Sequence, residues 1–286
     1  MNPFDLAGPQ FLLFYLVFGG SILLVLGLLR RVQESSDSLK VNLTDPYLIA
    51  YLRGGKNEVL RLGTVSLIDR GLLVVKGSRL QTDGQRTANI ITNPIEKALL
   101  HKFSAEDEAT SIYKNSSLEA ACRPYLETLT KQGLLPDEST RTARMTRFII
   151  GGAILFFVPF IKIMIALARG RHNILFLVLL TLLAIFLAYK VSNPFRTPKG
   201  SRLLGDLRTL FGALKDRAAG LTPGGATGEL ALLAAVFGMA AVPTSVFPHA
   251  KALYPKAASS SSSCGSSCGS SCGGGGCGGG CGGCGS

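Results

Sequence analysis

The sequence predicts a mainly α-helical membrane protein with three or four membrane helices, a small winged-helix-like α(+β) domain and a disordered tail. The segment from Phe148 to Tyr189 is almost wholly apolar around a polar turn, which indicates a hairpin of two membrane helices. The chain is 47% hydrophobic, as expected for a small multi-pass protein with one modest soluble domain. From Ser259 onward it contains only Ser, Gly and Cys, a composition that cannot build a core.

The first membrane helix is predicted over residues 10–29. Residues 1–9 carry no Lys or Arg, whereas Arg30 and Arg31 follow the apolar stretch directly. A secretory signal peptide would place basic residues before a shorter apolar core. We therefore expect an uncleaved anchor with residues 1–9 outside the cytoplasm and Arg30 inside.

Residues 30–147 are predicted to form a cytoplasmic, helical, winged-helix-like domain. Asp45-Pro46 and Asn93-Pro94 each favour a helix start, because Asp and Asn cap free amides and Pro suits the first helical position. A hairpin is expected over 72–81, with its turn at Gly77-Ser78. Two pairs have the spacing of a capping box, Ser104/Asp107 and Ser116/Glu119. Leu118–Leu129 carries an apolar stripe at helical spacing, which Pro124 interrupts. Two similar tetrapeptides suggest an internal repeat: Arg70-Gly-Leu-Leu and Gln132-Gly-Leu-Leu.

The net charge of +12 is unevenly distributed. Residues 35–138 hold 13 basic and 13 acidic residues, so the basic excess lies beside the apolar segments, where it predicts topology. DNA affinity rests largely on basic residues that neutralise phosphates, so we expect no nucleic-acid partner and a protein partner instead. The alternative is a local DNA-binding patch formed by Arg53, Lys56, Arg61 and Arg70.

The hairpin is predicted as a second membrane helix over 148–168, a turn at 169–172 and a third membrane helix over 173–189. Lys162 lies about one turn from the outer end and is expected to reach the interface, with a transport path as the alternative. Residues 190–229 predict a basic cytoplasmic loop. Its amphipathic segment, 202–219, suits either the anionic membrane surface or packing on the soluble domain.

Residues 230–247 are predicted as a fourth membrane helix, with a partly inserted segment as the alternative. A fourth crossing would carry the tail, residues 248–286, out of the cytoplasm. Its thiols would then be oxidised and could link chains by disulfides. Without that crossing the tail stays inside, reduced and better suited to a metal.

The tail cysteines match no defined zinc motif, so no metal ligand is assigned. No cofactor and no catalytic residue is assigned either. The tail cysteines remain candidates for disulfides, for a soft metal such as Zn²⁺ or Cu(I), or for modification. They are Cys264, Cys268, Cys272, Cys277, Cys281 and Cys284.

The chain resembles a family of uncharacterised bacterial multi-pass membrane proteins. The resemblance rests on Asn2-Pro3-Phe4-Asp5, Asp45-Pro46-Tyr47, Ile49–Leu52 with Gly54-Gly55, Arg169-Gly170-Arg171 and the Gly/Cys-rich end. It implies no activity and no catalytic residues. With scattered histidines and no catalytic motif, we expect a non-enzymatic interaction or surface-scaffold protein in the cell membrane, with the lipid bilayer as its first partner. A metal- or redox-handling protein and a precursor with a modified tail are the alternatives.

Overall fold

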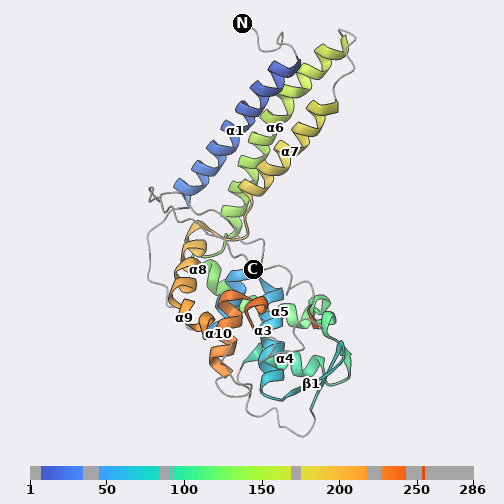
Figure 1. Ribbon diagram of the computed structural model, residues 1–286, viewed down its shortest axis with the longest axis vertical. Coiled ribbons are helices and arrows are strands. Elements are labelled where there is room, and N and C mark those ends of the chain that lie inside the picture. Colours follow the sequence, from blue (N-terminus) through green and yellow to red (C-terminus); the bar gives the residue numbers. More distant parts are fainter. Residues whose placement is uncertain are drawn as a thin grey trace, which may run out of the picture.

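A bundle of three long helices stands on a body of shorter helices and one small sheet (Figure 1). The computed structural model describes residues 8–34, 45–83, 91, 93–168, 175–217, 227–242 and 253–254. Of the interpretable residues, 79% are helical. The predicted turn at 169–172 and all six tail cysteines lie outside the described residues.

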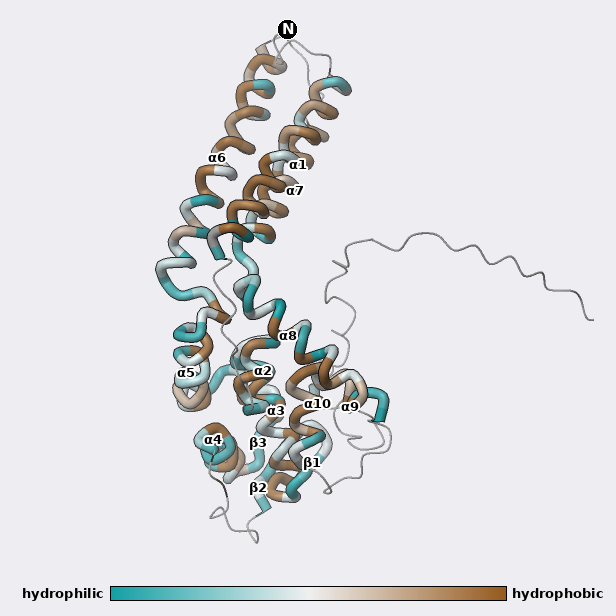
Figure 2. Tube along the Cα trace, turned by 90° about the vertical axis from the view of Figure 1, so that its left-hand side faces the viewer, coloured by the Kyte–Doolittle hydropathy of each residue, from teal (hydrophilic) through white to brown (hydrophobic). Residues whose placement is uncertain are grey.

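The bundle consists of α1 (Gly8–Gln33), α6 (Glu138–Ala168) and α7 (Leu175–Ser192). Each is long and apolar enough to cross a membrane, and these are the three helices that the sequence predicts there. Figure 2 shows apolar residues along the bundle and a hydrophilic start of α6 beside the body. This start, which the sequence analysis did not include in the helix, is stabilised by Asp137, whose carboxylate accepts from Thr140 N at 2.9 Å.

Small residues allow the three helices to approach closely. Gly151 on α6 faces Leu26 on α1, and Gly19 on α1 faces Leu155. On α7, Ala188 is fully buried beside these residues. Because apolar burial does not drive association in lipid, such close contacts supply much of the packing attraction.

A proline inside α6 creates a specific polar contact in the bundle. Pro159 has no N–H, so the carbonyl of Leu155 loses its usual intrahelical donor. The Tyr15 hydroxyl of α1 donates to that carbonyl at 2.8 Å, and Tyr15 is 1% exposed. An unsatisfied carbonyl is costly in hydrocarbon, so this bond fixes the register of α1 against α6.

The body contains α2 (Pro46–Gly54), α3 (Lys56–Asp69), α4 (Pro94–Lys102), α5 (Ser116–Lys131), α8 (Pro198–Leu210), α9 (Gly212–Asp216) and α10 (Thr227–Phe237), with short 3₁₀ helices at Ala109–Lys114 and Met239–Ala241. Strands β1 (Leu73–Lys76) and β2 (Arg79–Thr82) form an antiparallel hairpin in which Val75 pairs with Leu80, and β3 (Asp107–Glu108) adds to the other edge of β2. The hairpin predicted over 72–81 is therefore present.

Local capping explains which helix predictions hold. Asp45 accepts from Tyr47 N at 2.8 Å and Asn93 accepts from Ile95 N at 2.9 Å, which confirms both predicted starts. Both capping-box predictions are wrong. Asn115 caps α5 by accepting from Ser117 N and Leu118 N, whereas Asp107 pairs with Leu80 in the sheet instead of starting an α-helix.

The two similar tetrapeptides form the same helix stop. Gly71 and Gly133 both have φ of 69°, a conformation that glycine adopts without steric cost. Leu72 N donates to Leu67 O and Leu134 N donates to Leu129 O, each at 2.9 Å. This six-to-one bond defines the Schellman motif, in which the leucine after the glycine packs back on its helix.

The structure differs most from the sequence prediction at residues 230–247. Instead of a fourth membrane helix, the chain forms α10, which has 11 residues and a length of about 16 Å, half the thickness of a hydrocarbon core. Gly238, with φ of 98°, ends it. Ala234, Ala235 and Val236 are buried in the body core, and α10 packs on α2 and α3, so its apolar composition reflects a place in that core.

The structure also decides between the two interpretations of the amphipathic segment. α8 packs on α2 and α10, with Leu204 and Leu207 in the body core. Gly200 lies so close to the carbonyl of Leu134 that a Cβ there would overlap with it. The segment therefore covers the body, as the second alternative proposed, although Leu210 at its end stays exposed.

We expect Tyr15→Phe to lower the free energy of unfolding by about 0.6–2 kcal/mol, because the Leu155 carbonyl loses its donor. In a Pro159→Ala background the helix regains its own N–H donor at residue 159. The cost of Tyr15→Phe should then nearly vanish. Unfolding of the four variants in mixed detergent micelles measures this coupling, and an equal cost of Tyr15→Phe in both backgrounds would contradict it.

Candidate functional site

Cys122 is the one cysteine among the residues that the structure describes. It lies on α5 in the body core and is 2% exposed. Burial raises the pKa of this thiol to about 11, so it stays protonated and inert. Within the described ranges no group of three or more His, Cys, Asp or Glu could hold a metal ion. His172 and His249 fall outside those ranges.

The four basic residues that could have formed a DNA-binding patch are each paired with a carboxylate of the body. Lys56 Nζ lies 2.7 Å from Glu119, and Arg70 Nη1 lies 3.0 Å from Glu96. Arg53 and Arg61 share the third carboxylate, Glu58. These charges therefore neutralise local carboxylates and do not form a patch of free cations.

Glu96 is the centre of a buried polar network between α2, α3 and α4. The carboxylate is 2% exposed and is bonded by the hydroxyl of Tyr47 and the guanidinium of Arg70. Burial is the largest cause that raises the pKa of Tyr47, and the negative charge of Glu96 is the second. Tyr47 belongs to the Asp45-Pro46-Tyr47 motif, so this motif joins a helix cap to a core hydrogen bond.

A second network holds α10 and Tyr254 in the body. Arg53 Nε donates to the carbonyl of Ala235 at 2.8 Å, which satisfies one of the free carbonyls at the end of α10. Arg53 also bonds Glu58, which reaches Arg61 on the next turn of α3. Desolvation lowers the pKa of Arg53 and the Glu58 charge opposes it, as expected for a partly buried ion pair.

Arg61 extends this network to the last described residues of the chain. Its Nε donates to the Tyr113 hydroxyl at 2.6 Å, and its guanidinium lies over the rings of Tyr113 and Tyr254 at 5.3 and 5.8 Å. Tyr254 is 3% exposed. We call Arg53, Glu58, Arg61 and Tyr113 the C-terminal clamp, because together they contact the end of α10 and Tyr254.

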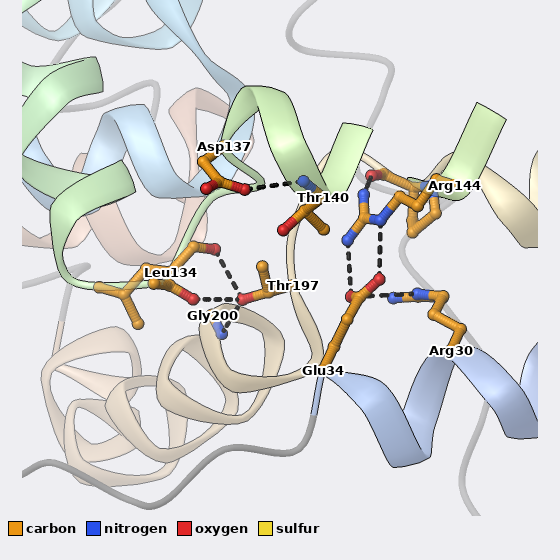
Figure 3. Close-up of polar contacts among 10 residues, drawn as sticks. Arg30, Glu34, Leu134, Asp137, Thr140, Arg144, Thr197 and Gly200 are labelled. Carbon is orange, nitrogen blue, oxygen red and sulfur yellow. Dashed lines mark hydrogen bonds and ion pairs between the residues drawn. The ribbon is translucent and has the colours of Figure 1, made fainter. Parts of the chain in front are cut away.

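A third network joins the bundle to the body (Figure 3). Arg144 on α6 donates through Nε and Nη2 to the two carboxylate oxygens of Glu34, at 2.8 and 2.7 Å, and through Nη1 to the carbonyl of Pro194. Arg30 Nε lies 3.7 Å from the same carboxylate. The side chains of Arg144 and Glu34 are 3% and 7% exposed. The end of α1, the start of α6 and the segment after α7 therefore meet at one buried ion pair.

The same segment is fixed to the body by backbone contacts. The Thr197 hydroxyl bonds the carbonyls of Gly133 and Leu134, and its oxygen accepts from Gly200 N at 3.1 Å (Figure 3). Arg196 donates to the carbonyls of Leu52 and Arg53 at the end of α2. These bonds satisfy carbonyls just after α5 and at the end of α2, so the link between α7 and α8 is part of the body.

Neither the clamp nor the junction was predicted as a site from the sequence. Arg53 and Arg61 were identified only as candidate patch residues, and Arg144 belongs to the basic excess before the second membrane helix that was used only to predict topology. Glu58 lies five residues after Arg53 and three before Arg61, a spacing that favours ion pairs along one helix. Their common role at the end of α10 depends on contacts between residues about 180 positions apart, which no local pattern contains.

We expect Gly238→Ala to lower the free energy of unfolding of the body by about 2 kcal/mol. Residue 238 has φ of 98°, and a Cβ there would overlap with the guanidinium of Arg53. Urea-dependent reactivity of Cys122 measures this, in protein whose six tail cysteines are changed to Ser.

Gly228→Ala is the matched control, since a Cβ at Gly228 in α10 has nothing within 4 Å. That variant should be neutral or slightly stabilised, because Ala favours the helix. Equal midpoints for the two variants would show that the end of α10 is not held as described.

Comparison of the chain with protein-family models, with curated proteins and with solved structures finds no match, so the family resemblance drawn from the sequence motifs stays a prediction.

Proposed function

We propose that the protein is a membrane-anchored interaction protein whose body lies in the cytoplasm and presents the thiol-rich tail there. Its three long apolar helices support anchoring in the bilayer. The ends of these helices that adjoin the body carry Arg30 and Arg31, Arg141 and Arg147, and Lys190. An excess of basic residues beside membrane helices favours the cytoplasmic side, which supports this orientation of the body.

One observation supports a position of the tail on the same side of the membrane as the body. The described part of the segment that was predicted to cross the membrane, residues 230–242, packs into the core of the body, and Tyr254, which lies beyond that segment, is buried beside Arg61. The sequence from Ser259 to Ser286 consists of Ser, Gly and Cys and has no apolar stretch able to cross a bilayer. We therefore propose the tail on the same side as the body, in place of the extracytoplasmic position expected from the sequence.

For the body we propose a winged-helix-like module that docks a protein and not DNA. The order α2, α3 and the β1–β2 hairpin supports this comparison. α3 packs against α2, α4 and α10, and eight of its 14 residues are buried, so little of it is free to enter a DNA groove. The pairing of Arg53, Lys56, Arg61 and Arg70 with carboxylates favours the same choice.

We expect a membrane-impermeant thiol reagent to leave the tail unlabelled in intact cells, even after a reducing pulse, and to label it after lysis. A tail in the cytoplasm is behind the bilayer and its thiols are kept reduced. Cys122 should contribute little under native conditions, because it is buried with a raised pKa.

Two variants control the labelling experiment. Changing Cys122 to Ser should leave the signal unchanged, and changing the six tail cysteines to Ser should remove it. Strong labelling of the parent protein in intact cells would place the tail outside and contradict the proposal.

A second candidate function is that the tail binds a soft metal ion. The position of Tyr254 in the body favours this candidate, because a tail on that side meets a reducing compartment where thiolates are available to Zn²⁺ or Cu(I). It also disfavours a disulfide-linked oligomer.

We expect protein purified under reducing conditions to carry Zn²⁺ or Cu(I), measured by elemental analysis, and a chain ending at Lys256 to carry none. Equal metal content in the two proteins would exclude the tail as the site. The described residues supply no competing cluster, which makes the shortened chain a clean control.

A further inference from the structure

A cavity of about 490 Å³ lies where α6 and α7 leave the apolar part of the bundle. Arg141 and Met145 of α6 contribute to one side, and Tyr189 and Asn193 at the end of α7, with Phe195 after it, contribute to the other. The apolar run of α6 starts at Phe148 and that of α7 ends at Tyr189, so the cavity lies at the height of the lipid headgroups.

Two arginines line this cavity, and they differ in how far their charges are paired within the protein. Arg144 also lines it, but its guanidinium is ion-paired with Glu34 and donates a further bond to the Pro194 carbonyl. Arg141 is exposed, and its guanidinium forms no hydrogen bond or ion pair with the residues that the structure describes. The nearest acidic group in sequence, Asp137, is engaged by Ser139 and Thr140. Among the described residues, the cavity therefore holds one cation without an anion.

The remaining lining suits a lipid better than a soluble anion. Met145, Tyr189 and Phe195 are each about half exposed and give the cavity an apolar wall. This wall continues along α6 to the exposed side chains of Ile149 and Phe156, which would face acyl chains. Asn193 also lines the cavity, and its buried Nδ2 has no hydrogen-bond partner in the described part of the chain.

We propose that this cavity binds the headgroup phosphate of an anionic phospholipid, with Arg141 as its charge partner. Basic pockets between membrane helices on the cytoplasmic side suit such headgroups. The proposal rests on the membrane anchoring and the cytoplasmic body, and it is independent of what the tail binds.

The chain contains no tryptophan, so Tyr189→Trp gives a single fluorescent probe in the wall of the cavity. The protein is reconstituted in phosphatidylcholine bilayers with a small fraction of brominated lipid, which quenches tryptophan on contact. Brominated phosphatidylglycerol should be enriched at the probe about fivefold over brominated phosphatidylcholine. Equal quenching by the two lipids would overturn the proposal.

Arg141→Gln should remove most of this preference, and Arg141→Lys should keep much of it. Arg147→Gln is the matched control, because it removes the same charge from the same helix outside the cavity wall. Equal loss in Arg141→Gln and Arg147→Gln would indicate a general surface charge and no site. Unchanged melting temperatures exclude misfolding as the cause of any loss.

Inorganic phosphate in the buffer separates the two sources of the anion. A preference that survives added phosphate supports a lipid held by headgroup and acyl chains together. A preference abolished by phosphate would mean that the cavity takes the free ion, and the lipid assignment would be wrong.

Discussion

The arrangement of this protein depends on the packing of α10 against α2 and α3. Arg53 bonds the carbonyl of Ala235, and Gly238 has the positive φ that lets the chain turn away beside that guanidinium. Since α10 belongs to the body, the bundle keeps three helices that are long and apolar enough to cross a membrane. The proposed position of the cysteines on the side of the body, and with it their proposed reduced state, rests on this contact.

The body and the bundle are joined by polar groups whose charges are paired with each other. Arg144 and Glu34 bind each other at two points and also hold the segment after α7, so three chain segments share one buried pair. A buried pair adds little net stability compared with apolar packing, but loss of one partner leaves an uncompensated charge. We infer that its role is to fix the angle between bundle and body. Tyr15 has the corresponding role inside the bundle, where it replaces the donor that Pro159 removes.

Sequence patterns predicted the parts of the fold that local physics determines. Long apolar runs located the three membrane helices, Asp45 and Asn93 located two helix starts, and Gly77-Ser78 located the hairpin turn. Where the predictions failed, a distant contact outweighed the local pattern. α10 is as apolar as a membrane helix because the body buries it on several sides, and Asp107 pairs with Leu80 instead of capping a helix. The clamp was missed for the same reason, since its partners are far apart in the sequence.

Hydrogen exchange of the full-length protein in lipid nanodiscs tests the place of α10 most directly. As urea is raised, amides of α10 should lose protection together with those of α2 and α3, because these helices share one core. Amides of α1, α6 and α7 should stay protected at that urea concentration, since the bilayer still surrounds them. If α10 instead stays protected with the membrane helices after α2 and α3 have opened, α10 crosses the membrane and does not belong to the body core.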